Sequence, residues 1–274
     1  MKALITILVV LLLAVSTYFY FTNETIRDTI TKTLTSEAEI HTTITSSNAV
    51  FVIFDPSGSG STTYNVPRIT TGFIGNLIDN IMAKGNGAIW LTYIDQNSYN
   101  NDVLHFEIPE APSKPIEPHR FAGEAMYKFN ERQAQYERDT AEYAKVEKEF
   151  HASFERSKTA FLGCCRRVID QEYQPKRPGT DWSDISGSLN TAVRSLKTVA
   201  QDSTHFRSIL LISDGVQELA KGRASQRLSE IPKDIKLVQV NQSGSNNNMV
   251  AGRAQEFDNL DRGLQQVVQS IHNQ

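Results

Sequence analysis

Short apolar segments that alternate with helical patterns restrict the fold of this chain more than any other feature. Residues 49–54 (AVFVIF) are wholly apolar and rich in β-branched and aromatic side chains, and turn residues follow at once. Such a segment is typical of a strand buried on both faces of a sheet. Further strands are predicted at 88–94, 208–213 and 235–241, and a strand of alternating polarity at 103–108.

Helical patterns separate these strands, at 65–84, 184–199, 216–230 and 256–271. Strands that alternate with helices favour a doubly wound, mostly parallel sheet with helices on both faces. The segment at 103–108 follows a short turn, so we expect it to return antiparallel at one edge. The sequence therefore predicts an α/β domain whose functional residues lie at the carboxyl ends of its strands.

A long helical insertion interrupts this alternation at about 109–174. A Pro-rich connector (109–118) precedes a charged helical stretch (119–172), in which four aromatic residues recur every seven positions and two more continue the stripe one step round the surface. The stripe either packs on the domain's own sheet or a neighbouring helix, or forms a projecting arm that meets another protein or a second copy. Its residues are Phe129, Tyr136, Tyr143, Phe150, Phe154 and Phe161.

The N-terminus begins with 20 residues free of charge, Ala3 to Thr22, about the length that crosses the roughly 30 Å of a bilayer core as a helix. Lys2 precedes this segment and aromatic residues end it, which predicts an inside N-terminus and an exported body. The alternative is a cleaved signal peptide with a site near Ala14-Val15-Ser16, but apolarity continues to Phe21 and favours an uncleaved anchor. Either interpretation places the body on the periplasmic or extracellular side.

The predicted organisation is a membrane anchor or uncleaved signal (1–22), a polar Thr- and Ser-rich stalk (23–47), and one domain (48–274) that contains the insertion. The formal charge is −3, from 28 Lys and Arg against 31 Asp and Glu, which argues against binding to nucleic acid through bulk positive charge. Cys164 and Cys165 are adjacent and form no disulfide framework, and the sequence assigns them no role.

Oxygen-bearing side chains stand in three loops, two of them directly after predicted strands and one before a predicted helix. Asp55, Ser57 and Ser59 come directly after the first strand, Ser183 stands at the start of a predicted helix, and Asp214 ends the fourth strand. Because the carboxyl ends of parallel strands share one edge, we expect these side chains to converge. Carboxylate and hydroxyl oxygens suit a hard divalent cation such as Mg²⁺.

At these residues the sequence resembles the von Willebrand factor A (vWA) domain family and its metal-ion-dependent adhesion site (MIDAS). That site reads D-x-S-x-S, then a Thr followed by Asp or Asn with Ile and by a Leu six positions on, then Asp-Gly after the fourth strand. Ser183 takes the Thr position by spacing and keeps the hydroxyl, and Thr180 is the alternative donor if the loop is shifted by three. The matching residues are Asp55, Ser57, Ser59, Ser183, Asp184, Ile185, Leu189, Asp214 and Gly215.

The resemblance implies a vWA or Rossmann-like fold and a binding module rather than an enzyme. The hydroxyls would contact Mg²⁺, or Mn²⁺ or Ca²⁺, and an open coordination position would accept an acidic side chain of a partner protein. One alternative is a metal-dependent phosphatase of the haloacid dehalogenase-like type with Asp55 as nucleophile, although Ser57 stands where a second acid is needed. The other is a metal-free scaffold that acts through the helical insertion, its serines only capping helices.

Overall fold

The computed structural model describes residues 48–57, 67–174, 182–198, 206–219, 227–240 and 248–272. The chain divides into two compact units, Met1–Thr43 and Ile44–Gln274, and every described residue belongs to the second. The predicted membrane segment and stalk therefore lie outside the described residues. Within the described ranges, each helix is too short or too polar to cross a membrane.

Six strands form one sheet in the order β3-β2-β1-β4-β5-β6. Neighbouring strands run parallel except β2 and β3, which pair antiparallel at one edge. The predicted α/β class, with a mostly parallel sheet and one antiparallel edge strand, is confirmed. The strands are β1 (Asn48–Phe54), β2 (Gly87–Tyr93), β3 (Leu104–Ile108), β4 (Phe206–Ile212), β5 (Ile235–Val240) and β6 (Gln255–Phe257).

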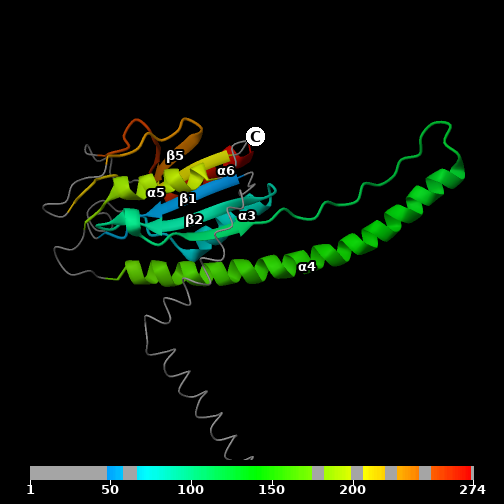
Figure 1. The fold of residues 1–274 in the computed structure, drawn as a ribbon, viewed down its shortest axis with the longest axis horizontal. Helices are drawn as coiled ribbons and strands as arrows, with labels where there is room; N and C mark the ends of the chain where they lie inside the picture. Colours follow the sequence, from blue (N-terminus) through cyan, green and yellow to red (C-terminus); the bar gives the residue numbers. More distant parts are fainter. Residues whose placement is uncertain are drawn as a thin grey trace, which may run out of the picture. The chain divides into compact units, whose positions relative to one another are not determined.

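Helices cover both faces of this sheet, which is why β1 is apolar at nearly every position (Figure 1). Val50, Val52 and Phe54 face a core built with α3 (Thr71–Met82), α4 (Met126–Glu172) and α6 (Leu260–His272). Ala49, Phe51 and Ile53 point the other way and pack on α5 (Ile185–Lys197). Successive side chains of a strand point to opposite faces, so a strand between two helical layers needs apolar residues throughout.

Three predicted helices differ from the structure. The helix predicted at 65–84 begins at Thr71, where the Thr70 hydroxyl caps it by accepting a hydrogen bond from the Phe73 N–H at 3.2 Å; residues 58–66 lie outside the described part. The helix predicted at 216–230 is wrong for residues 216–219 and 227–230, because Val216 and Glu218 form bridges with Asn248 and Ser183 instead. The start of the helix predicted at 256–271 forms β6, and α6 begins at Leu260.

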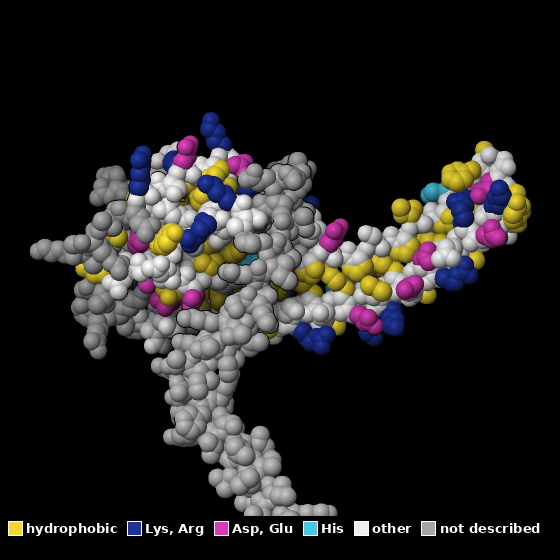
Figure 2. All heavy atoms as spheres, in the orientation of Figure 1, with side chains coloured by type: hydrophobic (Ala, Val, Ile, Leu, Met, Phe, Trp, Pro, Cys, Tyr) yellow, Lys and Arg dark blue, Asp and Glu magenta, His cyan; other side chains and the backbone are white. Residues whose placement is uncertain are grey.

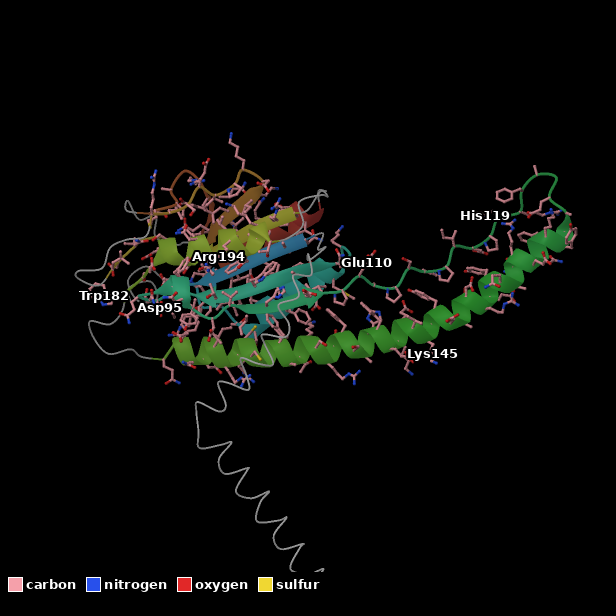
Figure 3. All side chains as sticks on the ribbon, in the orientation of Figure 1. Asp95, Glu110, His119, Lys145, Trp182 and Arg194 are labelled. Carbon is pink, nitrogen blue, oxygen red and sulfur yellow. The ribbon has the colours of Figure 1, made fainter. Side chains whose placement is uncertain are left out.

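The insertion consists of an extended segment (109–125) and the 47-residue helix α4. Figure 1 shows the segment leading away from the end of β3 and α4 returning; in Figure 3, Glu110 lies near the sheet and His119 near the distant end of α4. No residue of α4 before Phe154 is buried, whereas Phe154, Phe161, Cys165 and Ile169 are. The inner half of the stripe therefore packs on the domain's own core, as the first interpretation predicts, and the outer half projects from it. Contact of the outer half with another protein or a second copy stays a prediction.

The two cysteines belong to the inner half of α4. Cys165 lies in the core, where burial raises the pKa of its thiol to about 12, while Cys164 accepts a hydrogen bond from the Arg167 guanidinium at 3.2 Å. Both are free thiols. Cys165 therefore acts as a small apolar core residue.

Candidate metal centre

Asp55 occupies the carboxyl edge of the sheet, between β1 and β4. Its N–H donates to the Ile212 carbonyl at 2.9 Å, so the pairing of β1 with β4 continues one residue beyond the strand. Its side chain turns back, and Oδ1 accepts a hydrogen bond from the Ser57 N–H at 2.9 Å. Both residues are almost completely buried. Asp side chains commonly accept a hydrogen bond from the backbone two residues later in this way. The turn therefore brings Ser57 to the same site as Asp55.

Three hydroxyls surround the Asp55 carboxylate. The Ser213 Oγ donates to Oδ2 at 3.0 Å, the Ser183 Oγ lies 3.4 Å from the same oxygen, and the Ser57 side chain also hydrogen-bonds to this carboxylate. Ser57 follows β1, Ser213 follows β4 and Ser183 precedes α5. The sheet edge thus gathers one acid and three hydroxyls from three separate loops.

Asp214 follows Ser213 in the loop after β4 and is also buried. Its Oδ1 accepts a hydrogen bond from the Val216 N–H at 2.9 Å, and the neighbouring Ser213 side chain slightly lowers the pKa of its carboxyl. The next residue, Gly215, has φ +77° and lies so close to the Asn248 side chain that a Cβ would collide with it. The turn that places Asp214 at the edge therefore needs glycine.

The surroundings of Asp55 and Asp214 disfavour the ionised form of both carboxyl groups. Burial raises the pKa of Asp55 above its ordinary value, and the surrounding hydrogen bonds offset only part of that effect. Burial also raises the pKa of Asp214, and the negative charge of Asp55 raises it further. No Lys or Arg of the described ranges contributes to the shift of Asp55. A bound cation would supply the positive charge that this carboxylate lacks.

A second layer of hydrogen bonds fixes the loops. The backbones of Ser183 and Glu218 pair at 2.8 and 3.1 Å, and Asp184 caps α5 by accepting from the Gly187 N–H at 3.0 Å. Figure 3 shows Asp95 and Trp182 at this end of the sheet, and the Asp184 N–H donates to the Asp95 carbonyl. Ser183 is therefore held from both sides.

Sequence reasoning missed two kinds of contributor. Ser213 directly precedes the predicted ligand Asp214 and is not among the predicted site residues, although its hydroxyl donates to Asp55. Gln239, a polar residue inside the apolar strand β5, is fully buried, donates to the Ser213 carbonyl at 2.9 Å and accepts from Asn248 at 2.8 Å. A buried amide in a central strand is a signal in itself, because it requires partners.

A shallow hollow of about 560 Å³ lies near the acids. Its wall includes Tyr173, whose ring packs on Phe54 with centroids 5.6 Å apart and whose hydroxyl accepts from the Ile69 N–H at 3.2 Å. Burial and the negative charge of Asp55 raise the pKa of Tyr173 to about 12, although the Ile69 hydrogen bond and the charge of Arg68 oppose the rise. The Arg68 guanidinium stacks over the same ring at 5.0 Å. A positive side chain thus stands beside the edge without neutralising Asp55.

Of the predicted site residues, the structure brings Asp55, Ser57, Ser183 and Asp214 to one edge. Ser59 and the alternative donor Thr180 lie outside the described residues. In the described part of the chain no three His, Cys, Asp or Glu side chains are grouped to hold a metal ion. A cation at this edge would have to take hydroxyl and water oxygens as well as the carboxylates, which suits Mg²⁺.

Comparison with known proteins assigns no family to this chain. No protein-family model matches the chain, and no curated protein sequence is significantly similar to it. Any assignment of function depends on the arrangement and chemistry of the residues themselves.

Proposed function

We propose that this chain is a membrane-anchored, exported vWA-type module that binds a divalent cation, Mg²⁺ in preference, and uses it to hold an acidic side chain of a partner protein. The ligands would be Asp55, Ser57, Ser59, Ser183 and Asp214. The observation that carries the proposal is the buried Asp55 carboxylate, which is surrounded by hydroxyls and lies within electrostatic reach of a second buried acid.

The donor set suits binding rather than turnover. Neutral hydroxyls outnumber carboxylates, so a bound cation would keep enough positive charge to attract an incoming Asp or Glu. Ser57 stands two residues after Asp55, where an aspartyl phosphatase needs a general acid, and a hydroxyl does not serve.

The first test is a Mg²⁺ titration of the full chain in mild detergent, followed by thermal unfolding. A ligand at about one hundred times its Kd stabilises the folded state by roughly 2.7 kcal/mol, so a clear rise in Tm is expected. Asp55→Asn should abolish this rise. Without metal, the same variant should unfold at an equal or higher temperature, because the neutral amide removes the cost of burying an unpaired charge.

Asp258→Asn provides a matched control, because Asp258 is an exposed aspartate that pairs with Arg262. It should respond to Mg²⁺ like the parent chain. An equal rise in Tm for the parent chain and Asp55→Asn would show that the cation binds elsewhere. The absence of any response to Mg²⁺, Mn²⁺ or Ca²⁺ would reject the proposal. Hydrolysis of an aryl phosphate that Asp55→Asn abolishes would favour the phosphatase instead.

A further inference from the structure

The outer half of α4 and the extended segment together form an arm, and the segment already covers the aromatic stripe of the helix. Pro115 and Pro118 line a hollow of about 500 Å³ together with Tyr136 of α4. Pro112, Pro115 and Pro118 are partly buried, whereas the residues between them are exposed. A spacing of three matches the turn of a polyproline II helix, in which such prolines share one face. The stripe therefore has a partner in its own chain, and an external contact has to lie elsewhere on the arm.

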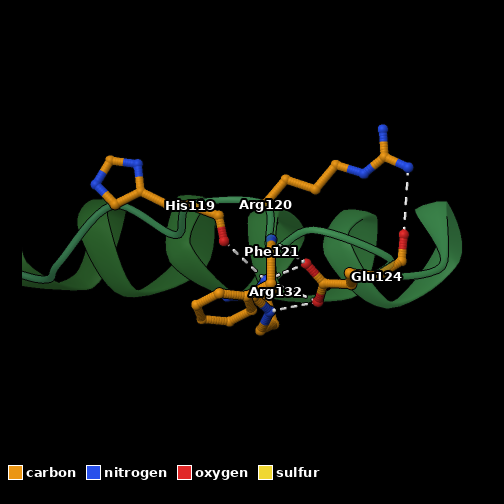
Figure 4. Close-up of polar contacts among 5 residues, drawn as sticks. All are labelled: His119, Arg120, Phe121, Glu124 and Arg132. Atoms are coloured by element: carbon orange, nitrogen blue, oxygen red, sulfur yellow. Dashed lines mark hydrogen bonds and ion pairs between the residues drawn. The ribbon is translucent and has the colours of Figure 1, made fainter.

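The tip of the arm, residues 119–128, is held in shape by one arginine. Arg132 donates to Glu124 Oε2 at 2.6 Å and Oε1 at 2.7 Å and to the His119 carbonyl at 3.0 Å, and its guanidinium lies 4.9 Å from the centroid of the Phe121 ring (Figure 4). These contacts tie the turn before α4 to the helix. The tip is therefore a defined structure at the end of the arm.

Large apolar side chains are exposed at this tip. Six such side chains are exposed among the described residues, and three of them belong to the tip: Phe121 (67%), Met126 (54%) and Tyr127 (63%). Phe121 lies in the turn before α4, and Met126 and Tyr127 begin the helix. A surface that meets the arm end-on would therefore contact all three, whichever side of the helix each one faces. Figure 2 shows apolar, Lys and Arg side chains at the end of the arm.

The charge that accompanies these apolar side chains is positive. The tip contains two basic residues, Arg120 and Lys128, and one acidic residue, Glu124. Glu124 is paired with Arg132, whereas neither Arg120 nor Lys128 forms an ion pair with any carboxylate of the described residues. Apolar side chains flanked by cations without acidic partners complement a surface that is apolar inside and negatively charged outside.

The size of the tip favours a lipid surface over a folded protein. At their exposed fractions, the three apolar side chains offer roughly 400 Å², about half of the ~800 Å² that each partner contributes to a stable protein interface. Binding to a lipid surface has no such threshold, because its strength increases with the apolar area inserted and with the attraction between cations and anionic headgroups.

We infer that the tip of the arm docks on the surface of a bilayer that contains anionic lipids. Phe121, Met126 and Tyr127 enter the boundary between headgroups and acyl chains, about 5–10 Å deep, while Arg120 and Lys128 remain at the level of the lipid phosphates. The contact needs neither a metal ion nor the predicted N-terminal anchor. It is therefore independent of the function proposed for the sheet edge.

Tryptophan fluorescence of the full chain in lipid vesicles with EDTA tests this contact. Tyr127→Trp places the probe at the tip, and Ala144→Trp places it on the exposed surface of α4, about 25 Å further along the helix at 1.5 Å per residue. The parent chain supplies the background of Trp90 and Trp182. The vesicles contain phosphatidylcholine with brominated acyl chains and about one-third phosphatidylglycerol. The added emission of Tyr127→Trp should shift to the blue and be quenched about twofold, and that of Ala144→Trp should do neither.

Two further changes in the Tyr127→Trp chain separate the apolar and the charged contributions. Phe121→Ser with Met126→Ser should remove the blue shift, because the apolar area is lost. Arg120→Glu with Lys128→Glu should reduce the quenching at least twofold, because the tip is then repelled by phosphatidylglycerol. Lys145→Glu is the matched control, since Lys145 is exposed in the middle part of α4 (Figure 3), and it should change neither quantity.

Three results would overturn the inference. Equal quenching of Tyr127→Trp and Ala144→Trp, or no quenching of either, would mean that the tip does not enter the bilayer. A blue shift of Tyr127→Trp without quenching by brominated lipid would assign the tip to a protein contact instead. Unchanged quenching in vesicles without phosphatidylglycerol would remove the role of the two cations. All substituted residues are at least partly exposed, so thermal unfolding should show a folded body in every variant.

Discussion

The two halves of α4 have one sequence pattern and two environments. The aromatic stripe runs through both, yet Phe154 and Phe161 lie in the main core while Phe129, Tyr136 and Tyr143 are only partly covered. The inner half finds Phe106 of β3, whose ring stacks on Phe161 at 5.1 Å. The outer half extends past the sheet, and among the described residues it has the extended segment beside it. A heptad pattern thus identifies an apolar face, and the surrounding fold decides what covers it.

Asp55 of the sheet domain and Glu124 at the outer end of the helical insertion have opposite pKa shifts. Asp55 is buried at the sheet edge, and burial raises its pKa. Glu124 lies at the arm's end, where hydrogen bonds from Arg132 hold its pKa below the ordinary value. Glu124 is already paired with Arg132 of its own chain, whereas the described partners of Asp55 are hydroxyls and the Ser57 N–H, none of them charged. The difference favours the sheet edge as the place where an external cation would bind.

The largest expected effect on stability is in the inner half of α4, which packs on the sheet. Phe161→Ala should lower the free energy of unfolding by about 3 kcal/mol, because a buried ring leaves a cavity that neighbours fill only in part. Phe129→Ala, on the same stripe, should cost less than about 1 kcal/mol. Urea unfolding of both variants measures the difference. Equal losses would mean that the outer half is as tightly packed as the inner one.

The stability of the metal-free chain should depend on pH through the two buried acids of the sheet edge, Asp55 and Asp214. Because the folded state raises the pKa of Asp55 and Asp214, the metal-free chain should lose stability as pH rises from the ordinary aspartate value through the raised one. Bound Mg²⁺ should reverse the trend, since only ionised carboxylates bind it, and its stabilisation should disappear as pH falls through that window. Tm against pH, with and without Mg²⁺, measures both. An Asp55→Asn curve that matches the parent would assign the effect elsewhere.

Removing the outer stripe should affect the body little. With Phe129, Tyr136, Tyr143 and Phe150 all changed to Ala, the free energy of global unfolding should fall by less than about 1 kcal/mol, because the arm can open without exposing the sheet core. Amide hydrogen exchange should instead show faster exchange confined to residues before Phe154. A broad loss of protection in β1 and β4 would contradict this.

The smallest effect is expected for the ion pair that links α4 to α3. Lys158→Ala removes its bond with Asp79, which is half exposed, and should cost about 0.5 kcal/mol. The measurement is again urea unfolding, beside Phe161→Ala. A cost comparable to that of Phe161→Ala would mean that charge, rather than apolar packing, fixes the inner half of α4.

Local sequence determined the strands of this protein. The segments later seen as β1, β2, β4 and β5 are apolar because both of their faces are covered, and β3 alternates because it lies at an edge. The positions of Asp55 and Asp214 followed, because a residue directly after a parallel strand has to lie at the carboxyl edge. The apolar stripe of α4 was equally visible, since side-chain period is a local property.

Tertiary structure decided the rest. The three residues of β6 carry no apolar pattern and form a strand only because β5 offers an edge to pair with. Residues 216–219 bridge Ser183 and Asn248 rather than forming a helix, and Ser213 reaches Asp55 across 158 positions of sequence. Each of these depends on a partner distant in the chain. Sequence period reports which face of an element is apolar, but it carries no information about which distant segment meets that face.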